Sequence, residues 1–228
     1  MESSFEAVAL AVSILAVFGI GMTMLNFLAG RGAHWARPWV EDRSPLVYGG
    51  VLVIFFAFMV AFGRIDPFQL LVIPHPGTFT AMLLLAPLVA LTFYFFELYL
   101  ASKQTIAPAG MLASSSARDA TENMIKQPPV WWGLAVASAI VEEYIFRGML
   151  LSALTADFNI VVGIAVSALI FGLHHITFGV VSVVSKSLGG VLFGIQVAVC
   201  GSLIPAMVSH LLFQYLVWRR MKRKEAGV

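Results

Sequence analysis

The stretch AIVEEYIFRGML, residues 139–150, places two adjacent carboxylates and an arginine inside an otherwise apolar run. Glu143 and Arg147 are four residues apart, so on a helix they share a face, with the acid in the favoured N-terminal position. Glu142 lies about 100° round the helix from Glu143, so Arg147 can neutralise only one of the two acids well. The other carboxyl is a candidate general base that faces a bundle interior. The alternative is a buried ion pair that only holds helices together.

The composition indicates a membrane protein. Hydrophobic residues make up 60% of the 228 residues and charged residues 11%, whereas soluble domains average about 45–50% and 25%. The basic residues form no continuous face, so we expect no nucleic-acid partner. A single cysteine, Cys200, excludes an internal disulfide and a cysteine-based metal cluster.

Apolar runs of about 20 residues can cross a bilayer, and the chain contains about seven of them. We expect spans at about residues 5–29, 46–63, 78–101, 130–154, 158–178, 186–200 and 203–218. The fold class is therefore all-α, a polytopic transmembrane helical bundle forming one integral-membrane domain over 1–228. Residues 1–129 hold three spans and a polar loop without motifs, and the motif-bearing core covers about 130–215.

The basic residues predict the orientation of these spans. Of the 14 lysines and arginines, all but Arg64 and Arg147 fall in alternate loops and in the C-terminal tail. The positive-inside rule then places the N-terminus outside and the C-terminus in the cytoplasm. We expect a multi-pass protein of the plasma or inner membrane, with the lipid bilayer as its surroundings.

Two later spans carry histidines. The fifth reads LIFGLHHITFG (169–179), in which Phe171 and His175 share a helix face and His174 points elsewhere. The seventh reads IPAMVSHLLFQY (204–215), in which His210 and Gln214 share a face. A single membrane histidine is usually structural, but acids, imidazoles and an amide on three helices supply a base, a water-holding group and oxyanion donors. These are the groups needed to hydrolyse a peptide bond.

The three segments together resemble the CPBP family, the CAAX-prenyl-protease and bacteriocin-processing membrane proteins also called the Abi family. Its marks are EExxxR, then FxxxH, then HxxxN or HxxxD. The resemblance covers about residues 130–215. It implies an intramembrane endopeptidase whose catalytic cavity lies between the fourth, fifth and seventh spans.

The resemblance also implies residue roles. Glu142 would be the general base, His175 would help to hold the attacking water, and Glu143 with Arg147 would orient the site. The FxxxH spacing selects His175, and a slipped helix would present His174 instead. The substrate would be a membrane-associated protein or peptide, cut near a terminus.

By the same resemblance, His210 and Gln214 would bind the oxyanion. Gln214 departs from the family pattern, because Asn or Asp is usual there. Glutamine keeps the amide donor but is one methylene longer, which shifts the contact unless the backbone compensates.

Three alternatives remain open at this stage. We expect no cofactor, but Glu142, His175 and His210 could instead hold a catalytic zinc ion, although HExxH is absent. Intramembrane acids and histidines also mark the proton paths of transporters. Finally, the departure at Gln214 would suit an inactive immunity or scaffold protein.

The GVLFG pattern (190–194) predicts close helix packing within the bundle. The sequence does not predict the oligomeric state.

Overall fold

The computed structural model describes residues 9, 12–14, 37–61, 68, 71–103, 126, 128–176 and 178–226. Within these ranges the regular elements are all helical, which confirms the predicted class. They are α3 (Arg37–Ala61), α4 (Pro76–Lys103), α6 (Pro128–Glu143), η4 (Tyr144–Leu151), α7 (Ser152–Asp157), α8 (Ile160–His174), α9 (Val180–Cys200) and α10 (Ile204–Glu225). The first predicted span, 5–29, lies outside the described residues except for positions 9 and 12–14.

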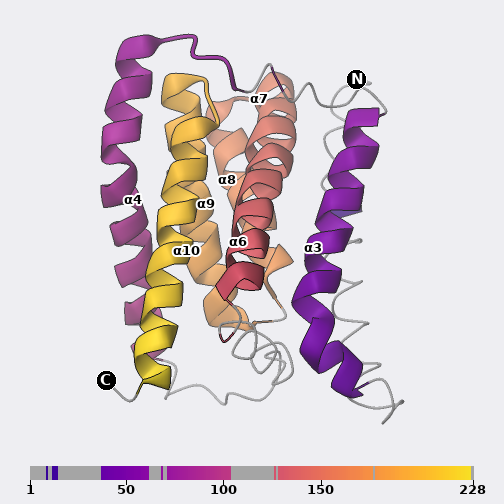
Figure 1. The fold of residues 1–228 in the computed structure, drawn as a ribbon. Helices are drawn as coiled ribbons and strands as arrows, with labels where there is room; N and C mark the ends of the chain where they lie inside the picture. The colour runs from indigo at the N-terminus through magenta and orange to yellow at the C-terminus, as the bar shows by residue number, and fades with distance from the viewer. Residues whose placement is uncertain are drawn as a thin grey trace.

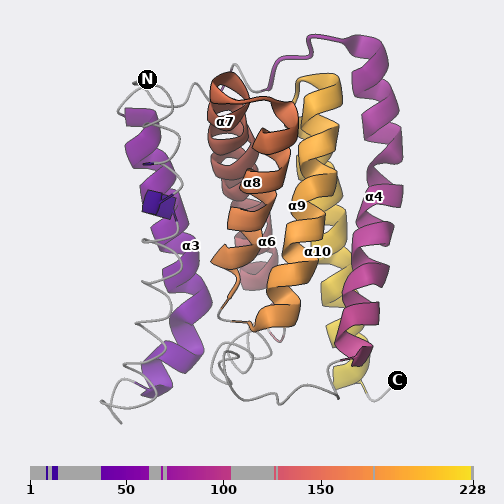
Figure 2. The same ribbon diagram turned by 180° about the vertical axis from the view of Figure 1, so that it is seen from behind.

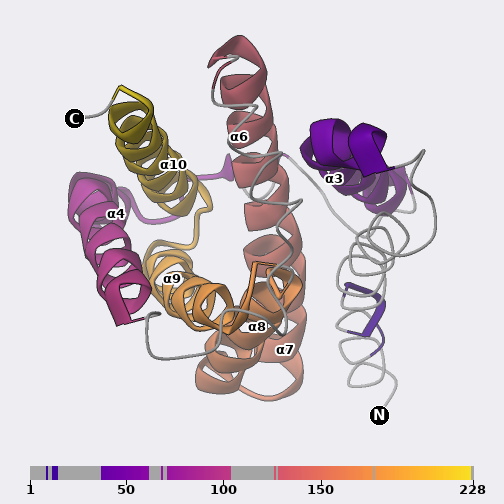
Figure 3. The same ribbon diagram turned by 90° about the horizontal axis from the view of Figure 1, so that it is seen from below.

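The helices run side by side in one bundle (Figures 1 and 2). Helix α9 contacts α4, α8 and α10, and α6 contacts α10 and α3 (Figure 3). The segments α6, η4 and α7 follow one another directly, and η4 and α7 pack against α8. The last turn of α4, the first turn of α6 and the last turn of α10 lie at the same end of the bundle, the lower end in Figure 1. Lys103 and the basic residues that follow Trp218 therefore gather at one end.

The outer faces of the bundle are apolar. Helices α4 and α9 are long and apolar enough to cross a membrane, and the apolar window of α4 is only 17% buried. Leu84, Leu88 and Phe95 of α4 are exposed, whereas the charged Glu142, Glu143 and Arg147 are buried. A helix that exposes its apolar side chains while the protein interior holds the charges is typical of a membrane protein rather than of a soluble core. The count of seven spans stays a prediction.

Several predicted helix ends were wrong. Helix α3 begins at Arg37 rather than at 46, and α10 continues to Glu225 rather than ending at 218. Helix α8 ends at His174, not at 178, so His175 is the first residue of the turn that follows. Helix α9 begins at Val180, directly after Gly179, whose φ of 96° is accessible mainly to glycine. Lys186, predicted to lie in a loop, is therefore within α9.

The fourth predicted span is not one uniform α-helix. It changes into the π-helix η4 directly after Glu143, and all eight residues of η4 are buried. The π-helix bonds residue i to i+5, and such segments occur frequently at functional sites. The wide turns therefore follow the two glutamates and contain Arg147.

Helices α8 and α9 approach each other closely. A β-carbon added at Gly190 would lie 2.8 Å from the α-carbon of Ala168, and one at Gly172 would lie 2.5 Å from the carbonyl oxygen of Val183. Only a residue without a side chain fits at such distances. The predicted packing role of the GVLFG segment within the bundle is confirmed.

Candidate active site

The site begins with a buried ion pair. Nη1 of Arg147 lies 3.2 Å from Oε1 of Glu143, and both side chains are 1% exposed or less. The guanidinium carbon also lies 4.3 Å from the ring centroid of Phe171 and 5.3 Å from that of Phe193. The predicted pairing is therefore present, and two aromatic rings contribute cation–π attraction to the desolvated cation.

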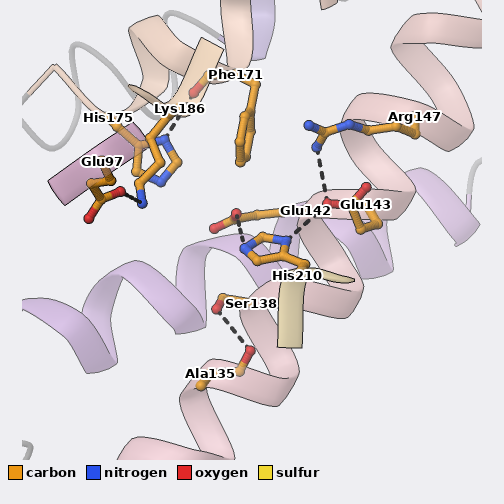
Figure 4. A network of polar contacts seen from close by, with 10 residues as sticks. All are labelled: Glu97, Ala135, Ser138, Glu142, Glu143, Arg147, Phe171, His175, Lys186 and His210. Carbon is orange, nitrogen blue, oxygen red and sulfur yellow. Dashed lines mark hydrogen bonds and ion pairs between the residues drawn. The ribbon is translucent and has the colours of Figure 1, made fainter. Parts of the chain in front are cut away.

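Glu143 also contacts a histidine on another helix. Its Oε1 lies 2.9 Å from Nδ1 of His210 in α10. The other ring nitrogen, Nε2, lies 3.9 Å from Oε2 of Glu142 (Figure 4). The His210 ring also stacks on Phe193, with centroids 5.3 Å apart and an angle of 26°. A hydrogen bond on one side and an aromatic ring on one face thus fix the orientation of this imidazole.

The second carboxylate faces the end of α8. Ligand atoms of Glu142, His174 and His175 all lie within 4.8 Å of one another. A water molecule that accepts or donates at about 2.8 Å to each group fits such spacings. Both adjacent histidines, not one of them, lie next to Glu142.

The backbone of Phe171 fixes the tautomer of His175. Nδ1 of His175 lies 2.9 Å from the Phe171 carbonyl oxygen, which can only accept, so Nδ1 carries the proton. Nε2 therefore presents a lone pair and can accept a hydrogen bond from water. The FxxxH spacing thus has two physical functions: the ring of Phe171 covers Arg147, and its carbonyl orients His175.

Gln214 is the one predicted site residue that the structure does not join to this cluster. Its side chain is half-buried in α10, one turn after His210. Within the described part of the chain, no hydrogen bond or ion pair of the Gln214 amide is found.

Sequence analysis missed a second ion pair nearby. Nζ of Lys186 lies 2.8 Å from Oε2 of Glu97 and 4.2 Å from the ring centroid of Phe213. Figure 4 shows Lys186 beside His175. The available signal was Lys186 itself, a cation between apolar stretches, but the charge pattern assigned it to a loop.

A buried amide was also missed. Oε1 of Gln196 in α9 accepts from the Ser209 hydroxyl at 2.9 Å, and its Nε2 donates to the carbonyl of Met82 in α4 at 3.3 Å. Ser209 directly precedes His210, so these bonds connect α4 and α9 to the helix that carries the imidazole. A lone amide in an apolar helix was the available signal.

Two carboxylates, three imidazoles and one guanidinium thus meet in the interior, contributed by α6, η4, α8 with its following turn, and α10. Such a set of groups can carry out acid–base chemistry in the interior of a helical membrane protein. Residues 125–216 match the family model described as type II CAAX prenyl endopeptidase Rce1-like. The chain therefore carries a Rce1-like domain, and the resemblance to the CAAX-protease family is confirmed. No curated protein and no solved structure matches the chain.

The matched segment contains every member of this cluster and covers less than half of the chain. An endopeptidase of the named type is a hydrolase that cuts peptide bonds. The match therefore supports a membrane protease over a transporter.

Proposed function

We propose that the protein is an intramembrane endopeptidase in which Glu142 activates a water molecule to cut a membrane-associated protein or peptide. The observation that carries this proposal is the convergence of Glu142, His174 and His175 within 4.8 Å. A carboxylate in this place can take a proton from water, and the Nε2 lone pair of His175 can accept the second O–H. The water would then present its oxygen to a carbonyl carbon.

His210 would stabilise the oxyanion that forms on attack. Because Glu143 occupies Nδ1, only Nε2 is available, and it donates when the ring is an imidazolium. Glu143 and Arg147 would act through His210, since they hold its ring rather than contact the substrate.

The proton taken by Glu142 completes the reaction. The tetrahedral intermediate collapses, the C–N bond breaks, and Glu142 returns the proton to the leaving amine. The products are a new carboxylate and a new amine, as hydrolysis requires. Gln214 remains our proposed second oxyanion donor, although its amide has no polar contact with the residues that the structure describes.

A zinc-dependent mechanism is the alternative that one observation favours. The predicted zinc set was Glu142, His175 and His210, but the cluster with suitable spacing comprises Glu142, His174 and His175. Two imidazoles and one carboxylate make a typical three-ligand catalytic set, and the bond from His175 Nδ1 to the Phe171 carbonyl matches the outer-sphere support of a metal-bound histidine. Zinc bound there would supply a water of lowered pKa.

The family match and the basic helix ends support our proposals for the substrate and for the orientation in the membrane. The matched family name points to CAAX-type C-terminal substrates, so a prenylated peptide is the first to test. The basic ends of α4 and α10 lie at one end of the bundle, which supports a cytoplasmic C-terminus and a multi-pass arrangement.

The decisive variant is Glu142→Gln, which keeps the shape of the side chain but removes the base. We expect cleavage of a quenched-fluorescent prenylated CAAX peptide by the reconstituted protein to fall by about 10²–10⁴-fold. Glu97→Gln is the matched control, because it removes another carboxylate of the bundle outside the buried cluster. If folded Glu142→Gln cleaves the peptide as fast as the wild type does, the proposal is overturned. The inactive-scaffold alternative predicts that neither the wild type nor Glu142→Gln cleaves it.

Metal dependence is decided separately. We expect purified protein to contain no stoichiometric zinc and to keep its activity after dialysis against a chelator. If a chelator abolishes activity, Zn²⁺ restores it and His174→Ala no longer binds zinc, then the mechanism is zinc-dependent rather than metal-free. His210→Ala is the control, because it lies outside the spacing-matched set.

A further inference from the structure

A groove lies between α4 and α10, away from the buried cluster. It encloses about 340 Å³. On the α10 side its lining is basic, formed by Arg219, Arg220, Arg223 and Lys224. None of these four side chains has an ion pair within the described part of the chain, and no acid is among the described lining residues. An unneutralised group of four cations favours an anionic occupant.

The other wall of the groove is apolar. It is formed by Leu91, Tyr94 and Phe95 of α4 together with Leu216 of α10. Phe95 is 60% exposed on the outer face of the bundle. A cationic rim next to an apolar wall matches an amphiphile, whose charged head and hydrocarbon chain need different surroundings.

Aromatic residues indicate where the groove lies in the bilayer. The ring centroids of Trp132 and Trp218 are 5.6 Å apart, and Tyr215 lies 6.1 Å from Trp132. Such clusters mark the level of the lipid headgroups. Lys224 follows Trp218 by six residues of helix, or about 9 Å along its axis. The cations therefore lie at headgroup depth or just beyond it.

We propose that this groove binds an anionic phospholipid, with the phosphate among the α10 cations and an acyl chain along Leu91 and Phe95 of α4. Basic pockets between helices at the cytoplasmic side recognise such headgroups. The lipid would join α4 to α10, the helix that carries His210, and so stabilise the bundle at this end. This inference does not depend on the peptidase mechanism.

The test measures lipid-induced stabilisation of the full chain. The protein is purified in neutral detergent, and its unfolding temperature is followed during titration with phosphatidylglycerol or with phosphatidylcholine. We expect saturable stabilisation by phosphatidylglycerol alone. The double variant Arg219→Gln/Arg223→Gln should need about fivefold more phosphatidylglycerol for the same stabilisation for each charge removed. The variant Arg219→Lys/Arg223→Lys keeps both charges and should bind the lipid as the wild type does.

The matched control is Lys103→Gln/Lys126→Gln, which removes two charges from the chain without altering the groove lining. Its titration should match that of the wild type. Equal weakening in both double variants would show a diffuse surface field and overturn the proposal. Equal stabilisation by inorganic phosphate would also overturn it, since the acyl chain would then contribute nothing.

Discussion

Two ion pairs of the bundle, Arg147–Glu143 and Lys186–Glu97, differ in a way that distance alone does not predict. Lys186 and Glu97 are closer, at 2.8 Å, but their side chains are 16% and 27% exposed. Arg147 and Glu143 are 3.2 Å apart and 1% exposed or less. Burial strengthens the interaction and also makes the loss of one partner costly, because the other is left in low dielectric. The Arg147–Glu143 pair, although its atoms are farther apart, should therefore contribute more to the stability of the fold.

The largest effect is expected from Arg147→Met. It should lower the free energy of unfolding by about 3–5 kcal/mol, because Glu143 keeps its charge in the interior without the guanidinium. Lys186→Met is the matched comparison and should cost about 1 kcal/mol or less, since the side chains of Lys186 and Glu97 are both partly exposed. Denaturant unfolding in detergent measures both. Equal losses would mean that burial does not separate the two pairs.

A smaller effect should follow from Phe171→Leu. The ring lies 4.3 Å from the Arg147 guanidinium, and a desolvated cation–π contact contributes about 2 kcal/mol. Phe146→Leu controls for the volume removed, because that buried ring is 6.0 Å from the same cation. The difference between the two losses in unfolding free energy measures how much stronger the attraction is at 4.3 Å than at 6.0 Å. A difference of zero would show that Phe171 only fills space.

The smallest effect concerns salt. Raising ionic strength should shrink the stability difference between wild type and Lys186→Met, because exposed charges are screened. The difference between wild type and Arg147→Met should stay constant. If both differences respond alike, water reaches the buried pair.

The sequence predicted the parts of this molecule that follow regular periodicity. The helical class and the Glu143–Arg147 pair both follow from apolar length and i,i+4 spacing. The start of α9 was missed because Ser182, Ser185 and Lys186 resemble a loop in hydropathy. In the structure Ser185 bonds to the Ser182 carbonyl and lies 3.4 Å from Glu97, so these polar groups are satisfied within and between helices.

The contacts that complete the site were beyond prediction. The approach of His174 as well as His175 to Glu142 depends on where α8 ends, which is set by the following turn and Gly179. The bond between Gln196 and Ser209 joins neighbouring helices through a side-chain geometry that spacing does not contain. The role of Gln214 as an oxyanion donor stays a prediction, because a shared helix face with His210 places the amide without giving it a partner.

The π-helix η4 also affects how this chain aligns with other sequences. A turn closed by an i to i+5 bond uses more residues than an α-turn, so η4 shifts the phase of the helix after Leu151 relative to the phase before Glu143. A helical wheel drawn through residues 128–157 with one constant angle therefore assigns the faces of α7 incorrectly. A relative with a uniform α-helix here would match this chain only through a gap inside the helix. Such a gap, usually treated as an alignment error, would keep the glutamates and Leu154 in structurally equivalent columns.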